Sequence, residues 1–266
     1  MDKNTVLLHD SLPLWSKDYR GMPNALARSA LFSVSRSAER RDFKREVIAS
    51  SQGVTLVYTG EELHQDDEDV FLQVLHLAKE QKLGEDIKFT ANSMILALGW
   101  TRNAGSYERL SQCMTRMAGM LLELTVNLAD GSRMHYAGSL IGEFSWREKV
   151  TDDPLREWVV SLQKNIVKLF DPHAYSLLHW PTRMSLTPTA KWLHAYYSTH
   201  KQPFPVKVET LHAAMASEIK AMRSFRAKLK EALALLVESG FFLSAHIDPK
   251  SDLVHVERAA DRRRLE

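Results

Sequence analysis

Basic and hydroxyl side chains recur between residues 218 and 238 at the spacing of one helix face. At about 100° per residue, Phe225, Leu229 and Leu233 fall on a single apolar arc, which predicts a helix buried along that side. On the opposite arc and its margins lie Lys220, Arg223, Ser224, Arg226, Lys228 and Lys230. Arginine can donate two hydrogen bonds to guanine O6 and N7, and lysine can neutralise a phosphate. This face is suited to duplex DNA, with a merely solvated helix face as the alternative.

A second predicted helix, from residue 106 to about 120, carries a weaker version of the same pattern. Its apolar arc contains Leu110, Cys113 and Met117. The polar side chains outside that arc are Arg109, Ser111, Gln112, Thr115 and Arg116. They can donate hydrogen bonds to phosphates and base edges, but Glu108 lies among them. A structural or dimerisation role is the alternative for this helix, and Cys113 is expected to be a core thiol.

The elements around these two helices recur in the same order in both halves of the chain. The order is helix, strand, helix, helix and hairpin, and the two copies are offset by 207 minus 88, or 119 residues. The predicted ranges are 66–81, 87–89, 90–98, 106–120, 122–128 and 134–140, then 187–200, 206–208, 209–215, 218–238, 241–247 and 253–256. This is the order of a winged helix, whose last helix enters the major groove. The sequence therefore predicts an α+β, mostly helical fold with tandem winged-helix domains.

The boundary between the two copies is predicted at about residue 150. Residues 146–154 are polar and charged and end in Pro154. The predicted domains are 1–150, for DNA contact and for dimerisation or partner binding, and 151–266, the main DNA-reading domain. The first has 18 basic and 20 acidic residues, or −2, and the second 17 and 13, or +4. The total of +2 thus hides a more basic second half.

Several classes of protein are excluded or disfavoured by the composition. A single cysteine excludes an intrachain disulfide framework and a zinc site built on paired thiolates. There is no His-Glu-x-x-His pair, phosphate-binding loop or Gly-x-Ser-x-Gly elbow, so we expect no enzyme, metal or cofactor. The acidic run 66–69 suits a helix start better than a metal site. The absence of a long apolar run and of a basic, apolar leader predicts a cytoplasmic protein without a membrane contact.

Four longer motifs resemble those of a known family. They are Leu-Pro-Leu-Trp at 12–15, Arg-Gly-Met-Pro-Asn-Ala-Leu-Ala-Arg-Ser-Ala-Leu-Phe at 20–32, Tyr-Thr-Gly-Glu-Glu-Leu at 58–63, and Ser-Thr-His-Lys-Gln-Pro-Phe-Pro-Val-Lys-Val-Glu-Thr at 198–210. Together they resemble the TrfA family of bacterial plasmid replication initiators, from about residue 12 to about residue 256.

The resemblance implies a non-enzymatic initiator with tandem winged-helix domains. Such a protein binds direct repeats, the iterons, in a replication origin and opens an adjacent AT-rich region. It recruits the host initiator, replicative helicase and sliding clamp, binds as a monomer, and forms dimers that limit copy number. Contact with the released single-stranded AT-rich DNA is also expected. Related initiators have a clamp-binding peptide that ends in Leu-Phe, which Leu31 and Phe32 match, although Arg28 replaces the expected glutamine and burial of the pair is the alternative.

Two other functions remain open on the sequence alone. A winged-helix transcription regulator would bind one palindromic operator as a dimer. A protein-interaction module would leave the basic face merely solvated and would show no salt-dependent binding to DNA.

Overall fold

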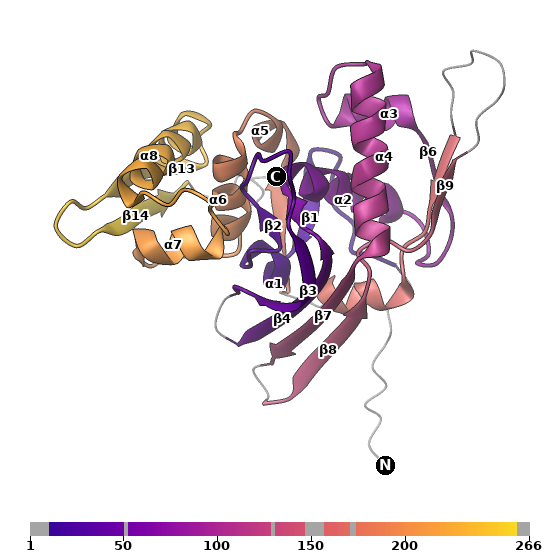
Figure 1. Cartoon of the computed structure of the whole chain (residues 1–266), viewed down its shortest axis with the longest axis horizontal. Coiled ribbons are helices and arrows are strands. Elements are labelled where there is room, and N and C mark those ends of the chain that lie inside the picture. The colour runs from indigo at the N-terminus through magenta and orange to yellow at the C-terminus, as the bar shows by residue number, and fades with distance from the viewer. Residues whose placement is uncertain (1–10, 51–52, 129–130, 147–156, 171–173, 260–266) are drawn as a thin grey trace.

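A four-stranded antiparallel sheet forms one side of the first part of the chain in this computed structural model, which describes residues 11–50, 53–128, 131–146, 157–170 and 174–259. The strands are β3 (Asp42–Ile48), β4 (Val54–Glu61), β7 (Leu121–Asn127) and β8 (Arg133–Gly138), in the order β3-β4-β7-β8 (Figure 1). Leu122 and Leu124 of β7 pair with Tyr58 and Leu56 of β4, and all four side chains are buried. Because side chains alternate along a strand, one face of the sheet covers the core.

The remaining elements before residue 185 complete this part of the molecule. They are β1 (Tyr19–Pro23), α1 (Asn24–Ala27), β2 (Phe32–Ser33), β5 (Leu63–His64), α2 (Gln65–Ala78), β6 (Ile87–Thr90), α3 (Ala91–Ala97), α4 (Ala104–Gly119), β9 (Phe144–Trp146), β10 (Glu157–Val160), the 3-10 helix η1 (Lys164–Phe170), β11 (Tyr175–His179) and α5 (Trp180–Met184). Strand β1 pairs with β11, β2 with β5, and β10 with both β6 and β9. Strands β10 and β11, which come late in this part of the chain, therefore pair with the much earlier strands β6 and β1.

Helix α2 is the central helix of this part. The helix predicted at 66–81 is present, and its apolar side chains Val70, Phe71, Val74, Leu75 and Ala78 are all buried. The helix is nevertheless buried on its other sides as well, because it packs against β1, α3 and α4 and against a helix of the second part of the chain. A helix that is surrounded in this way must neutralise the charged residues of its first turn with buried partners.

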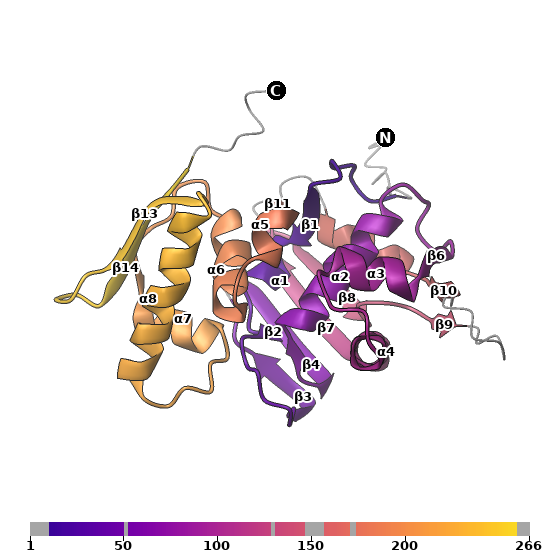
Figure 2. The same ribbon diagram turned by 90° about the horizontal axis from the view of Figure 1, so that it is seen from above.

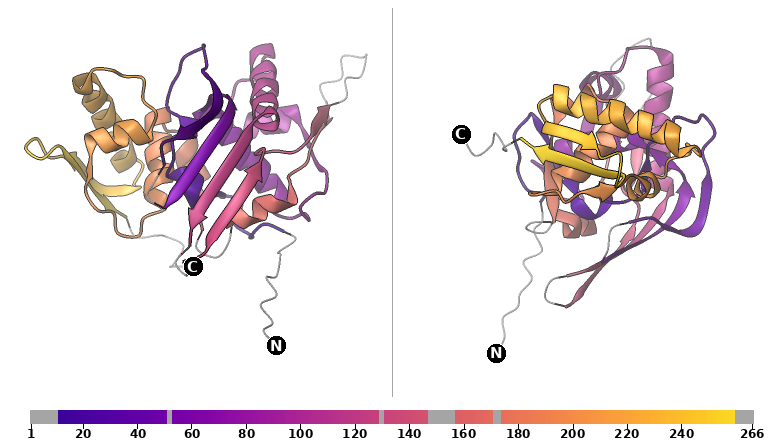
Figure 3. Two further views of the ribbon diagram at one scale, coloured as in Figure 1. Left: turned by 60° about the horizontal axis from the view of Figure 1, so that its bottom comes forward. Right: turned by 90° about the vertical axis from the view of Figure 1, so that its left-hand side faces the viewer.

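The second part of the chain is a smaller group of helices with a three-stranded sheet. Its elements are α6 (Pro188–Ser198), β12 (Val206–Lys207), α7 (Val208–Ala214), α8 (Met222–Glu238), β13 (Phe242–Ile247) and β14 (Leu253–Arg258). The strand order is β12-β14-β13. Trp192 and Tyr197 of α6 pack with Phe225, Leu229 and other apolar residues of α8. The right-hand view of Figure 3 faces this part, with α8 and the β13–β14 hairpin on the outer side of the molecule.

Two separate clusters of buried apolar side chains define two units, but they do not divide at residue 150. The first cluster extends to Trp180 and also includes Ala195, whereas the second begins at Leu186. Strand β10 follows residue 150 yet pairs with β6 and β9 of the first cluster. Residues 11–180 are therefore called the first unit and residues 186–259 the second unit. The predicted boundary segment 147–154 lies outside the described residues.

The predicted repeat holds for the order of the elements but not for the pairing of the strands. In the second unit, β12 pairs with β14 of the following hairpin. In the first unit, the corresponding β6 pairs with β10, and the hairpin β7–β8 pairs with β4 instead. The two units thus share an order of elements but differ in the way their strands pair. Strands also make up much of the described chain, so the fold is mixed α and β and the expectation of a mostly helical fold is not confirmed.

A buried group of charges joins the two units at the first turn of α2. Arg183 of α5 is fully buried and donates to Asp69 at 2.7 Å, and it lies 3.3 Å from Glu68. Lys191 of α6 also contacts Asp69. Burial alone would lower the pKa of Arg183, but the charges of Glu68 and Asp69 raise it, so the guanidinium stays charged. Burial raises the pKa of Glu68, and the charge of Asp69 adds to this shift, whereas the charge of Arg183 opposes it.

Replacing Arg183 with methionine is expected to lower the free energy of unfolding by about 3–5 kcal/mol, because two buried carboxyl groups lose a common partner. Urea unfolding followed by circular dichroism measures this change. Arg45→Met is the matched control, since the ion pair of Arg45 with Glu123 is exposed and contributes little. Equal stability of the two variants would contradict the structural role of Arg183.

His194 of α6 should make stability depend on pH. Its pKa lies well below the ordinary value, because of burial first and then of the charges of Arg183 and Arg258. The unfolded chain therefore binds more protons than the folded chain below pH ~6.5, so stability is present above that pH and falls below it. Urea midpoints at neutral and mildly acidic pH should differ less in His194→Asn than in the unsubstituted chain. An unchanged difference would show that other groups carry the dependence.

Candidate nucleic-acid interface

The basic side chains of α8 lie on the outer side of the second unit. Phe225, Leu229, Leu233 and Leu236 are buried, which confirms the apolar arc expected from the sequence. Arg223, Ser224 and Lys230 are exposed, and none of them has a hydrogen bond or an ion pair within the part of the chain that the structure describes. Uncompensated cations on a convex helix face are available to phosphates and base edges.

The turn before α8 places Lys220 beside this face but outside the helix. The helix begins at Met222 and not at residue 218, with Ala221 as its cap residue. His212 of α7 contacts the carbonyl oxygen of Ile219 through Nε2 at 2.8 Å, and Ala216 has a positive φ of 47°. These contacts fix a tight, irregular turn. Lys220 is exposed in it, with no ion pair among the described residues.

Arg226 connects α8 to the turn of the β13–β14 hairpin. Its guanidinium makes two bonds to the carboxylate of Asp252, at 2.8 and 2.7 Å. The hydrogen bond and charge of Asp252 raise the pKa of Arg226, and those of Arg226 lower the pKa of Asp252. Of the cations predicted to contact DNA on this helix, Arg226 is therefore engaged in positioning the hairpin. Its expected direct contact with DNA remains a prediction.

The hairpin adds polar groups that the sequence prediction did not include. Lys250 is exposed in the turn, and its backbone N–H donates to Asp248 at 3.0 Å. His246 and His255 form a cross-strand pair with their rings stacked 5.0 Å apart. The alternation of the two strands could have identified the histidine pair. The location of Lys250 at the tip depends on the turn formed by Asp248, which accepts a bond from Ser251.

The polar side chains of α4 are arranged differently, because most of them already have partners. Arg116 is mostly buried and donates twice to Asp67, at 2.9 and 3.0 Å. Arg109 donates to Asp66 at 3.0 Å and lies over the ring of Trp100. The other predicted contacts are also engaged or half-buried: Gln112 donates to Glu108, Thr115 to the carbonyl of Ser111, and the Ser111 side chain is half-buried.

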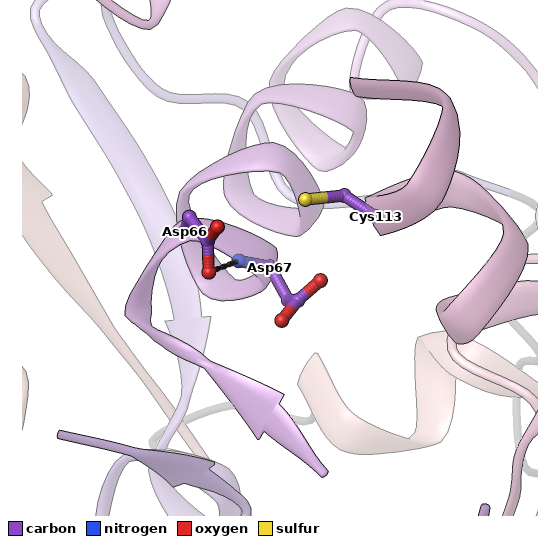
Figure 4. A group of neighbouring side chains, drawn as sticks. All are labelled: Asp66, Asp67 and Cys113. Carbon is purple, nitrogen blue, oxygen red and sulfur yellow. Dashed lines mark hydrogen bonds between the residues drawn. The ribbon is translucent and has the colours of Figure 1, made fainter. Parts of the chain in front are cut away.

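The predicted burial of Cys113 is confirmed, and the acidic start of α2 lies next to it. Figure 4 shows Asp66, Asp67 and Cys113, whose possible ligand atoms all lie within 4.8 Å of one another. Both oxygens of Asp67 are already bonded, one to Arg116 and the other to Arg40 at 2.6 Å. Burial first, and then the charges of Asp67 and Asp66, raise the pKa of the Cys113 thiol well above its ordinary value. A neutral thiol and arginine-bound carboxylates do not fit a metal site.

The first turn of α2 instead forms a capped helix start, as the acidic run favoured. The backbone N–H of His64 donates to Asp67 at 2.8 Å, which completes a capping box. Asp66 and Asp67 also suit the positive end of the helix dipole.

The proposed clamp-binding pair is buried. Leu31 and Phe32 are only 3% and 2% exposed, and Phe32 begins the short strand β2. Arg28, where the expected glutamine would stand, donates to Thr199 of α6 through Nε at 2.7 Å. In this conformation a peptide-binding partner cannot reach Leu31 or Phe32, so the structure does not support the clamp-binding assignment. The apolar pair fills the first core instead.

The two helices with basic patterns, α4 and α8, lie in different places and differ in what their cations contact. Helix α8 lies near one end of the molecule and α4 well away from it, on the other side of the first unit, in both Figures 1 and 2. The outward cations are those of α8 and the turn before it, whereas the arginines of α4 point to the acidic start of α2. No helix in the described ranges is long and apolar enough to cross a membrane.

Comparisons with known proteins identify close and distant similarities. A family model described as TrfA protein matches residues 2–258. The chain is 32% identical over 254 residues to the plasmid replication initiator protein TrfA of Escherichia coli. That match covers 94% of this chain but 64% of the relative, so the chain spans a little under two thirds of the length of that protein.

Two solved structures share the fold. Both contain domains 2 and 3 of RctB, and they align with TM-scores of 0.60 and 0.58. The first alignment covers 87% of this chain and 97% of the RctB chain at 9% identity, and the second covers 86% and 95% at 10% identity. At such low identity the likeness concerns the fold alone.

Arg116→Ala is expected to lower the free energy of unfolding by about 1–3 kcal/mol, because Asp67 loses two of its buried hydrogen bonds. Gln112→Ala, on the exposed side of the same helix, is the control and should leave stability nearly unchanged. Urea unfolding and a DNA-binding titration of the folded variants separate stability from affinity. Unchanged stability with a large loss of affinity would show that Arg116 contacts DNA and would contradict its internal role.

Proposed function

The chain belongs to the TrfA family, and on this premise we propose that it is a plasmid replication initiator. In this proposal it binds direct repeats in a replication origin and promotes opening of an adjacent AT-rich region. It then recruits the host initiator, the replicative helicase and the sliding clamp. The name of the Escherichia coli relative supports the assignment, and the 94% coverage of this chain extends it to nearly all residues.

The observation that carries the proposal is the uncompensated basic face of α8. Lys220, Arg223 and Lys230 are exposed cations with no ion pair in the described ranges, and Arg226 fixes the hairpin next to them. A helix with free arginine and lysine side chains has the chemistry for both base edges and phosphates. We propose that Lys220, Arg223, Ser224 and Lys230 contact the DNA directly, and that Arg226 acts mainly by positioning the hairpin.

The second unit is proposed to work as a winged helix. Its order of elements and its strand order β12-β14-β13 support this assignment, because the strand between the first two helices joins the hairpin that follows the third. In a winged helix the last helix enters the major groove and the hairpin contacts the adjacent backbone. Helix α8 and the Lys250 turn correspond to these two parts.

The first unit is proposed to contribute less to base recognition. Its helix α4 has Arg109 and Arg116 bound to acidic residues, and its sheet does not have the strand pairing of the second unit. We propose that this unit contacts mainly the sugar-phosphate backbone of the DNA. It also provides the surfaces for dimers and host proteins. Two linked modules would gain affinity on repeated sites, because the second binds as an intramolecular event.

The opening of the AT-rich region is proposed to need no catalytic step by this chain. Deformation of the duplex and binding of the released single strand would drive it, with the host proteins supplying any nucleotide hydrolysis. The proposed location is the cytoplasm, where a plasmid origin and these partners are found, with no membrane contact.

Footprinting on the DNA that flanks the coding sequence tests the proposed function. The expected result is a series of head-to-tail protected repeats beside an AT-rich tract. A single protected palindrome would indicate a transcription regulator instead. Binding that is absent, or that does not weaken with added salt, would contradict DNA binding altogether and favour a protein-interaction module.

Arg223→Ala and Lys220→Ala are each expected to weaken binding to the protected repeat by about 1–3 kcal/mol, with the folded structure unchanged. Fluorescence anisotropy titrations measure the affinity. Lys228→Ala is the matched control, because Lys228 lies on α8 like Arg223 but is paired with Glu231 at 3.2 Å. If both variants bind as tightly as the control, α8 is not the helix that reads DNA.

A further inference from the structure

The segment between β2 and β3 lies directly against the turn that precedes α8. The backbone N–H of Val34 donates to the carbonyl of Met215 at 3.3 Å. Ser33 donates through Oγ to the carbonyl of Ala216 at 3.5 Å, and Ser35 donates to Glu218 at 2.8 Å. These residues are more than 180 positions apart in the chain, yet they bring the first unit to the edge of the DNA-reading face (Figure 2).

Alternate serines hold this segment in a fixed conformation. The backbone N–H of Ser35 donates to Oγ of Ser33 at 3.1 Å, and that of Ser37 donates to Oγ of Ser35 at 3.1 Å. The next N–H, of Glu39, donates to Oγ of Ser37 at 3.2 Å. Each hydroxyl group accepts a hydrogen bond from the backbone N–H two residues later. These bonds satisfy N–H groups that have no backbone partner in a loop. The side chain between them, Arg36, is therefore presented from an ordered backbone.

Arg36 is an exposed cation without an assigned role. It has no hydrogen bond or ion pair in the described ranges, whereas the nearby Arg41 is bonded to Glu62 at 2.9 Å. Acidic groups near this segment include Glu218, which is bonded to Ser35, Glu62, which is bonded to Arg41, and the exposed Glu39. The charge of Glu218 also contributes to the raised pKa of Arg41, after the hydrogen bond to Glu62. Arg36 is thus the unengaged cation of this segment.

The position of Arg36 relative to the reading face follows from the chain itself. Arg36 is next to Ser35, which is bonded to Glu218, and Lys220 is two residues after Glu218. Two residues span at most about 7 Å of extended chain. The backbone at Arg36 therefore lies close to Lys220 and the start of α8, where the two units meet.

We propose that Arg36 contacts a phosphate of the duplex that α8 reads, so that the DNA interface continues from the second unit onto the segment 33–37 of the first. This inference rests on the proposed function, because it requires that α8 binds DNA. The ligand is the sugar-phosphate backbone and not a base, since a lone arginine at the rim of the face adds charge and register without sequence information. Ser35 is a positioning residue, which fixes both Arg36 and the turn before α8.

The test compares Arg36→Ala with Arg133→Ala in the full chain. Arg133 is also an exposed arginine of the first unit, at the start of β8 and away from α8, so both variants lose one positive charge. Anisotropy titrations use the footprinted repeat and a mixed-sequence duplex of equal length over a series of salt concentrations. Arg36→Ala should weaken binding to both duplexes by a similar factor and reduce the slope of log affinity against log salt by about 0.9.

The outcomes separate this inference from the proposed function. If the unsubstituted chain binds neither duplex, the proposed function fails. If Arg223→Ala weakens binding but Arg36→Ala behaves like Arg133→Ala, α8 reads DNA and the inference about Arg36 is wrong. If Arg36→Ala weakens only the repeat, Arg36 contacts a base and the assignment to phosphate is wrong.

Ser35→Ala provides an independent test of positioning. This variant keeps the charge of Arg36 but removes the bonds to Glu218 and to the N–H of Ser37. It should weaken binding to DNA less than Arg36→Ala does. When Ser35→Ala is combined with Arg36→Ala, its additional effect should be smaller than its effect alone, because the effects of residues that act together are not additive. Full additivity in folded proteins, checked by thermal unfolding, would contradict the positioning role.

Discussion

The burial of the acidic first turn of α2 is the constraint on which the rest of the structure depends. Carboxylates that leave water must be paired, because an unpaired buried charge is strongly destabilising. The cations that pair with Asp66, Asp67, Glu68 and Asp69 come from distant segments and are Arg40, Arg109, Arg116, Arg183 and Lys191. A single helical turn therefore fixes the loop before β3, helix α4, and the connection through α5 and α6 to the second unit.

The same constraint decides which basic residues remain available outside. Arg109, which stays exposed, and the mostly buried Arg116 are both paired with acidic residues at the start of α2, so α4 presents few unpaired cations. The second unit has no comparable acidic cluster among its described residues, and the cations at the start of α8 stay exposed. The distribution of internal partners, rather than the number of basic residues on each helix, sets the ranking of the two helices. A near-neutral total charge is compatible with a basic face for this reason.

Local patterns predicted the parts of this structure that depend on local physics. The apolar arc of α8, the helix predicted at 66–81 and the hairpin after α4 follow from helical or alternating periodicity, and the structure has all three. The predicted boundary at 150 does not coincide with the division between the two apolar cores. The reason is that β10, after residue 150, pairs with β6, a strand almost 70 residues earlier. Periodicity placed Arg116 outside the apolar arc, but its partner Asp67 is 49 residues away and cannot be inferred from spacing. Leu31 and Phe32 matched a short motif whose burial depends on the whole first core.

Hydrogen exchange with and without duplex DNA tests most directly the claim that the interface lies on α8 and its borders. Amide groups in the turn 216–221, in the hairpin turn 248–252 and in the segment 34–37 should exchange more slowly when the repeat is bound. Those in the exposed start of α4, at 104–109, should change little. Slower exchange at α4 with no change around α8 would contradict the account, because it would place DNA on the helix whose two arginines are already paired with the acidic start of α2.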